Sequence, residues 1–162
     1  MSGIGHNGGP ALERATGWKR HCWTAARAAL LPTLPIEVVR LRVKRAAELG
    51  LDYKTYAGVR AQTGHDVVAF LFSSNALRVT ALRPVAPDAV AGKLAAVKAG
   101  RLGLAVAPLS PGVLEASNPA LDGASAAPYA LAPWGAARAA IRAALGKLPG
   151  DGVLLVGTHG LE

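Results

Sequence analysis

The sequence predicts an α/β fold: a small, mostly parallel sheet of three to five strands with flanking helices and an N-terminal helical segment. Residues 66–72 and 102–107 are nearly continuous apolar runs, which is typical of strands buried on both faces. A helical pattern over residues 87–99 separates them. Apolar strands that alternate with helices favour a parallel sheet in two or three layers.

The composition indicates one folded domain. The chain has 162 residues, of which 51% are hydrophobic, and this is enough for a sizeable core. The single cysteine, Cys22, excludes an internal disulfide and favours a reducing, cytoplasmic location. No stretch reaches the roughly 18 apolar residues of a membrane span. No metal-ligand set or nucleotide-binding motif is recognisable, so we predict no cofactor and no metal.

The positive charge is concentrated in the first part of the chain. The net charge is +8, and the first 60 residues carry ten Lys or Arg against four Asp or Glu. The last 52 residues carry three against four. A basic surface is typical of proteins that bind nucleic acid, anionic lipid or phosphorylated ligands, although it also serves solubility alone.

The N-terminal half is predicted to be helical. Residues 1–14 are Gly-rich and predict a flexible tail, and residues 15–63 form a basic helical segment. Apolar periodicity, prolines after the first helix, Gly50 and a capping Asp52 delimit the expected helices. These helices cover residues 16–31, 35–49 and 52–62.

The second half, residues 64–162, is predicted to form the α/β segment and to pack with residues 15–63 as one domain. Besides the two apolar runs, a strand is expected at 76–82, with a helical turn as the alternative, and another strand at 153–156. A helix is expected at 132–148. The Ala/Pro/Ser/Gly-rich stretch at 111–131 predicts a long loop, with a helical turn at 113–116.

The opening of the chain carries a resemblance. Residues 3–10, Gly-Ile-Gly-His-Asn-Gly-Gly-Pro, are similar to the start of a set of bacterial proteins that open with Ile-Gly-His-Asn-Gly-Gly-Pro. The segment 34–77 also resembles such proteins. No activity is known for this set, and the resemblance implies no functional residue.

Four basic residues are the first candidate site. On a helix with about 100° per residue, Arg42 and Arg45 lie within about 60° of each other and away from the acids of their own helix. Lys54 and Arg60 follow in the next helix. We expect these four to bind nucleic acid or another polyanion, or an acidic protein. Burial of either arginine against an acid such as Asp66 would instead make it a structural ion pair.

The same region partly fits a DNA-binding helix-turn-helix. Ala46 and Gly50 match the first helix and the turn, and Tyr56 and Val59 match the second helix. Gly58 within that second helix weakens the match, because glycine costs a helix about 1 kcal/mol relative to alanine. An αα-hairpin that packs on the sheet explains the same residues.

The ends of the strands give a second candidate. In open parallel sheets, ligands bind beyond the carboxyl ends of the strands. Six polar residues follow the apolar runs and would meet at one edge. There they would form the site of an α/β enzyme for a small ligand that bears a phosphate or carboxylate. They are Ser73, Ser74, Asn75, Ser110, Thr158 and His159. Polar turn residues without a ligand explain them equally well.

A tryptophan-rich basic helix is the third candidate. Trp18, Lys19, Arg20, His21 and Trp23 lie close together in the first expected helix. Such a helix is suited to a membrane surface or to stacking on bases, or it packs in the core.

Overall fold

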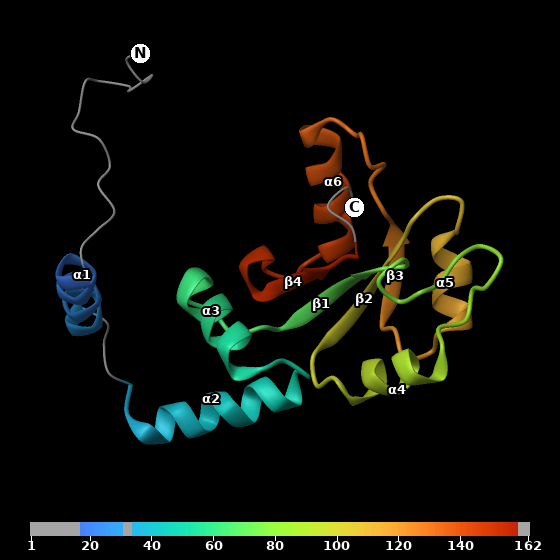
Figure 1. Ribbon diagram of the computed structural model, residues 1–162. Coiled ribbons are helices and arrows are strands. Elements are labelled where there is room, and N and C mark those ends of the chain that lie inside the picture. The colour runs from blue at the N-terminus through green and yellow to red at the C-terminus, as the bar shows by residue number, and fades with distance from the viewer. Residues whose placement is uncertain (1–16, 31–33, 159–162) are drawn as a thin grey trace, which may run out of the picture. The chain divides into compact units, whose positions relative to one another are not determined.

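The computed structural model describes residues 17–30 and 34–158 (Figure 1). The chain divides into two compact units, residues 1–38 and 39–162. Helix α1 (Gly17–Leu30) and the first turn of α2 (Ile36–Glu48) belong to the first unit. The rest of α2 and all later elements belong to the second. The tail predicted at residues 1–14 lies outside the described residues.

The second unit is built on a four-stranded, all-parallel sheet in the order β3-β2-β1-β4. This confirms the predicted fold class. Strand β1 lies between β2 and β4, so the strand order reverses beside β1. The four strands are β1 (Ala69–Ser73), β2 (Gly100–Ala105), β3 (Gly123–Ala126) and β4 (Val153–Val156).

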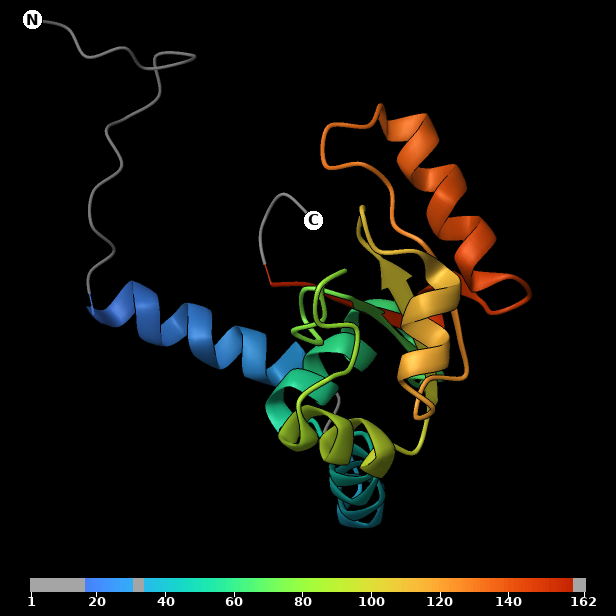
Figure 2. The same cartoon turned by 90° about the vertical axis from the view of Figure 1, so that its right-hand side faces the viewer.

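Helices connect the strands along both faces of the sheet (Figures 1 and 2). Helix α4 (Asp88–Ala96) leads from β1 to β2, and α5 (Pro111–Ser117) from β2 to β3. Helix α6 (Trp134–Leu145) leads from β3 to β4 on the opposite side from α4. Helix α3 (Tyr53–Thr63) follows α2, and a 3₁₀ turn (Gly150–Gly152) precedes β4.

The core forms two clusters of buried side chains on the face of the sheet opposite α6. The first cluster joins α4 and α5 to β2 through residues such as Leu94, Leu114 and Ala105. The second joins α2 and α3 to β1 and includes Tyr56 and Phe70. Phe72 of β1 packs against both clusters. The sheet is therefore thickly covered on this face.

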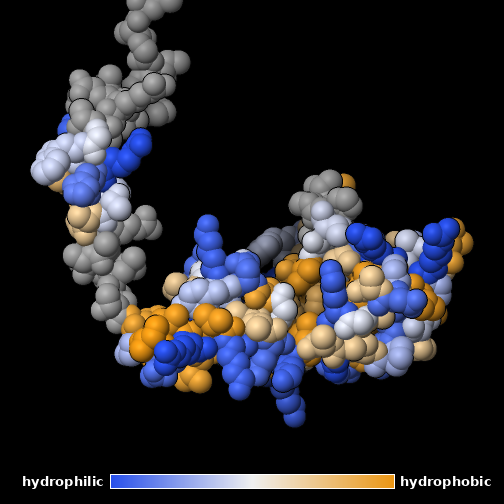
Figure 3. Space-filling model, turned by 60° about the horizontal axis from the view of Figure 1, so that its bottom comes forward, coloured by the Kyte–Doolittle hydropathy of each residue, from blue (hydrophilic) through white to orange (hydrophobic). Residues whose placement is uncertain are grey.

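The first half of α2 carries exposed apolar side chains. Ile36, Leu41 and Val43 are all exposed, and hydrophobic side chains gather over this part of the helix (Figure 3). Ala46, in the second half, is buried in the core cluster with Tyr56. Only the second half of α2 is thus anchored on the sheet.

Helix α3 has the caps that its sequence predicts. The carboxylate of Asp52 accepts a hydrogen bond from the backbone N–H of Thr55 at 3.0 Å. Gly64 ends the helix with a φ of 75°, in the left-handed region, and its N–H donates to the carbonyl of Arg60. Glycine takes this conformation at little cost, whereas a residue with a Cβ is strained.

We expect opposite effects from two glycine-to-alanine changes in this helix. Gly64→Ala should lower the free energy of unfolding by about 1 kcal/mol, because alanine resists a positive φ. Gly58→Ala should raise it by up to about 1 kcal/mol, because Gly58 lies inside α3 with open space around its Cβ position. Urea unfolding of both variants measures this. Changes of the same sign would contradict the prediction.

Two predicted elements differ from the structure. The strand predicted at residues 76–82 is a turn followed by a single bridge between Thr80 and Arg83. Its apolar residues Leu77 and Val79 enter the core cluster from the turn and need no strand pairing to be buried. Within the loop predicted at 111–131, helix α5 covers the helical turn expected at 113–116, whereas strand β3 was not predicted. β3 consists of Gly, Ala and Ser, and pairing with β2 rather than propensity makes it a strand.

Candidate ligand crevice at the carboxyl edge of the sheet

A crevice of about 980 Å³ opens at the carboxyl ends of the strands, between the sheet and α6. Its lining includes Ser73 at the end of β1, Leu104 of β2 and Leu155 of β4, together with the segment that joins β3 to α6. The crevice therefore spans the point beside β1 where the strand order reverses. Open α/β sheets bind their ligands at such points.

The walls of the crevice are mainly apolar. Leu104 and Leu155 alternate along their strands with residues of the opposite, thickly covered face, so they point toward α6. Helix α6 contributes Ala137 and Ile141. None of the twelve residues of α6, all of them described, is buried. This helix therefore covers the sheet loosely and leaves room for a ligand.

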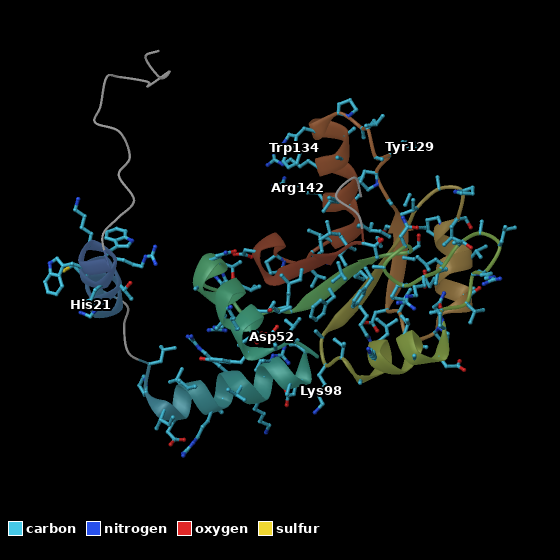
Figure 4. The ribbon with its side chains drawn as sticks, viewed as in Figure 1. His21, Asp52, Lys98, Tyr129, Trp134 and Arg142 are labelled. Atoms are coloured by element: carbon cyan, nitrogen blue, oxygen red, sulfur yellow. The ribbon has the colours of Figure 1, made fainter. Side chains whose placement is uncertain are left out.

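Two aromatic side chains stand at the entrance. Tyr129 lies on the segment that leads into α6, and Trp134 is the first residue of the helix (Figure 4). Both line the crevice, yet they are 80% and 81% exposed. Sequence reasoning missed these residues. The spacing of Trp134, Ala137 and Ile141 was an available sign that this helix has one apolar face.

The six residues predicted at the strand ends have different positions. Ser73, Asn75 and Thr158 line the crevice. Two others, Ser74 and Ser110, have structural roles instead. Ser74 is buried, and its Oγ accepts a hydrogen bond from the N–H of Val106 at 3.1 Å.

Ser110 is the N-cap of α5 rather than a residue of the crevice. Its Oγ accepts a hydrogen bond from the N–H of Val113. A serine directly before a helix is typical of this capping role. His159 lies outside the described residues. The predicted set is therefore brought together only in part.

The turn after β1 holds Asn75 in place. The Oγ of Ser73 accepts the N–H of Ala76 at 3.1 Å, and the N–H of Arg78 donates to the carbonyl of Asn75 at 2.9 Å. Arg78 has a φ of 58°, an uncommon conformation for a residue other than glycine. The side-chain amide of Asn75 makes no hydrogen bond within the described chain, so its donors and its acceptor are available in the crevice.

The chemistry of the lining favours binding over proton transfer. The lining that residues 34–158 provide contains no Asp, Glu, His, Cys, Lys or Arg. The same residues hold no cluster of three His, Cys, Asp or Glu that could bind a metal ion. The crevice thus offers apolar walls with a few neutral hydrogen-bonding groups, an arrangement typical of small-molecule sites.

Two of the four residues of the predicted polyanion site form ion pairs with acids of the chain. Arg45 donates to the carboxylate of Asp66 at 3.0 Å and to the carbonyls of Val67 and Lys98 at 3.0 and 3.1 Å. It also contacts Glu48 at 3.4 Å. The expectation that Arg45 lies away from the acids of its own helix is therefore wrong, because Glu48 follows it by one turn.

The remaining members of that set do not form one patch of free charge. Arg60 lies 3.8 Å from Asp66, so two of the four basic residues share one carboxylate. Arg42 is half-buried and Lys54 is exposed, and neither makes an ion pair within the described chain. The four residues therefore do not act as a cluster without acids.

The residues that fit a helix-turn-helix have structural roles here. Ala46 and Tyr56 are buried in the cluster that anchors α2 and α3 on Phe70 of β1, with Val59 packed against it. This is the αα-hairpin that the sequence allowed as the alternative. The hydroxyl of Thr55, in the second helix of that motif, donates a hydrogen bond to the carboxylate of Asp52 at the start of α3.

No family model, no curated protein and no solved structure matches this chain. Any functional assignment therefore depends on the geometry of the crevice and on the surface of the described residues.

Proposed function

We propose that this protein binds a small organic ligand in the crevice between the sheet and α6. The observation that carries the proposal is the place of this crevice: it lies at the carboxyl ends of the strands, where the strand order reverses beside β1. Its volume of about 980 Å³ is in the range of small-molecule sites. Ser73, Asn75 and Thr158 in its lining support the second of the functions expected from the sequence.

The lining indicates the chemistry of the ligand. Leu104, Ile141 and Leu155 would pack against an apolar body, and the rings of Tyr129 and Trp134 would cover a flat one. The free amide of Asn75 would hold a carbonyl, hydroxyl or carboxylate of the ligand. Two aromatic rings exposed to water are unfavourable in the empty protein, and a ligand that covers them would gain free energy from their burial.

Anilinonaphthalene sulfonate, an aromatic dye with one anionic group, tests the crevice. In the variant Trp18→Phe with Trp23→Phe, Trp134 is the only tryptophan, so its quenching by the dye reports on the crevice alone. On this background we expect Ala137→Phe, which places a ring among the lining residues, to weaken dye binding at least about tenfold. Asn75→Ala should weaken binding about threefold to tenfold through one lost hydrogen bond.

Ala139→Phe is the matched control. Ala139 lies on the exposed side of the same helix and does not line the crevice, so this change should leave dye binding within about twofold of the parent. Equal losses of dye affinity in Ala137→Phe and Ala139→Phe would show that the dye binds elsewhere and would overturn the proposal. Failure of Trp134 to respond to the dye would do the same.

Polyanion binding through the basic first half of the chain stays a prediction with less support than the crevice. Arg45 and Arg60 already face Asp66, which leaves Arg42 and Lys54 as the members of that set without an ion pair among the described residues. Two separate bases support few phosphate contacts. An acidic protein partner would likewise find only these two basic residues without an ion pair among the described residues.

A further inference from the structure

Helix α1 exposes the side chains that proteins usually cover. Every side chain described in it, from Gly17 to Ala26, is exposed. Trp18 and Trp23 are 73% and 71% exposed. The ring of His21 stacks on that of Trp18, with their centres 5.8 Å apart. Two exposed tryptophans within six residues indicate a surface that meets a partner.

The charge of α1 has one sign. The helix contains Lys19, Arg20 and Arg27, and its sequence from Gly17 to Leu30 has no Asp or Glu. Neither Lys19 nor Arg20 makes an ion pair with a described residue. A partner that covers this helix and balances its charge is therefore anionic.

Apolar residues of this helix gather on one side, and of its basic residues Arg20 lies away from that side. At about 100° per residue, Cys22 and Ala26 lie between Trp18 and Trp23, and Arg20 lies on the opposite side. Lys19 lies within the arc from Trp18 to Trp23, next to Trp23, where its long stem can lie along an apolar surface while its ammonium group reaches outward. The helix is therefore amphipathic, with a tryptophan near each border of its apolar side.

We propose that α1 binds the surface of a membrane that contains anionic lipid. Helices that lie in a lipid interface combine an apolar side, interfacial tryptophans and basic residues that meet the headgroups. Its 14 residues measure about 21 Å, so the helix lies along the surface. Among residues 17–30 and 34–158, no helix has the length and apolar character needed to cross a bilayer.

Anionic lipid fits α1 better than a nucleic acid does. A nucleic acid would contact the basic side chains and the tryptophan rings of α1. It would leave the apolar side, with Cys22 and Ala26, exposed to water. A lipid interface contacts both kinds of residue at once, because its acyl chains cover the apolar side and its headgroups meet the basic residues. Because the apolar side is made largely of alanine, its insertion alone is weak, and binding should depend on the negative charge of the lipid.

Fluorescence of the full-length protein tests this proposal. In Trp134→Phe, only the tryptophans of α1 emit, and the single cysteine, Cys22, accepts an environment-sensitive label without any further substitution. We expect vesicles of phosphatidylcholine with phosphatidylserine to shift the tryptophan emission to the blue and to brighten the label at Cys22. Vesicles of phosphatidylcholine alone should leave both signals nearly unchanged.

Two double variants separate the contributions. Trp18→Ala with Trp23→Ala should weaken sedimentation with the anionic vesicles at least about tenfold. Lys19→Ala with Arg20→Ala should weaken it about 25-fold, or about fivefold for each base near the anionic surface. The matched control is Lys93→Ala with Lys147→Ala, which removes two exposed lysines outside α1 and should change binding less than about twofold.

Three results would overturn the proposal. Equal losses from the α1 and control charge variants would show that net charge alone attracts the protein. An unchanged label at Cys22 in the presence of anionic vesicles would show that α1 stays in water. A single-stranded oligonucleotide that changes both signals where the vesicles do not would assign α1 to nucleic acid instead.

Discussion

Arg45→Ala should lower the free energy of unfolding by about 2 kcal/mol, because it removes the partner of Asp66 and frees two backbone carbonyls. The two side chains of this ion pair are 27% and 37% exposed, which places the effect below that of a fully buried pair. Arg45 joins the end of α2 to the segment before β1 and to the segment before β2. Its loss should therefore loosen the helical pair from the sheet. Urea unfolding at neutral pH measures the change.

Arg42→Ala is the matched control for this prediction. Arg42 lies one turn earlier on the same helix and makes no ion pair among the described residues, so its loss should change the free energy of unfolding by no more than about 0.5 kcal/mol. Similar effects from the two changes would mean that the contacts of Arg45 contribute nothing beyond its charge. A large difference would show that the contacts of Arg45 stabilise the fold beyond the effect of its charge.

The effect of Arg45→Ala should also depend on pH. Burial raises the pKa of Asp66, but hydrogen bonds from Tyr56 and Arg45 outweigh burial and hold the pKa below its ordinary value. A carboxyl with a lowered pKa stabilises the fold above its unfolded pKa of about 3.9, and this contribution is lost as the pH falls through the folded pKa. The difference in stability between the parent and Arg45→Ala should therefore narrow below about pH 4. A difference in stability that stays the same below pH 4 would show that the ionised carboxylate of Asp66 is not the reason for the effect of Arg45→Ala.

The elements that could be predicted are those with a local sequence pattern, such as an apolar run or a capping residue. The apolar runs gave β1, β2 and β4, and Asp52 marked the start of α3. Strand β3 has no such signal, because Gly, Ala and Ser are poor strand formers and only pairing with β2 orders them. The segment at residues 76–82 is apolar because its side chains fill the core from a turn. Alternating apolar residues in the sequence do not distinguish such a turn from a strand.

The candidate site shows the same division. Ser73, Asn75 and Thr158 could be predicted, because the carboxyl ends of parallel strands meet at one edge. Tyr129 could not, and the spacing of Trp134 in its helix indicated an apolar face but not a place in a crevice, which depends on how loosely α6 lies on the sheet. The main partner of Arg45 is Asp66, 21 residues further along the chain, and no helical wheel contains such a contact. Only the contact with Glu48 was visible in the spacing of the helix.

A buried asparagine joins two segments that are distant in the sequence. Asn118, at the end of α5, is 5% exposed. Its amide nitrogen donates to the carbonyls of Pro84 and Leu114, both at 2.8 Å, and its oxygen accepts the N–H of Ala86 at 2.8 Å. The segment before α4 has little regular structure, so this side chain supplies hydrogen bonds that secondary structure would otherwise provide.

Asn118→Ala should therefore lower the free energy of unfolding by about 3 kcal/mol, because it leaves a buried N–H and two carbonyls short of a partner. Asn75→Ala is the matched control: the amide of Asn75 lines the crevice without a hydrogen bond in the described chain, so its loss should cost no more than about 0.5 kcal/mol. Thermal and urea unfolding of both variants compare the two amides directly. A small effect at Asn118 would mean that water replaces its hydrogen bonds, and a large effect at Asn75 would show that this amide stabilises the fold and is not held free for a ligand.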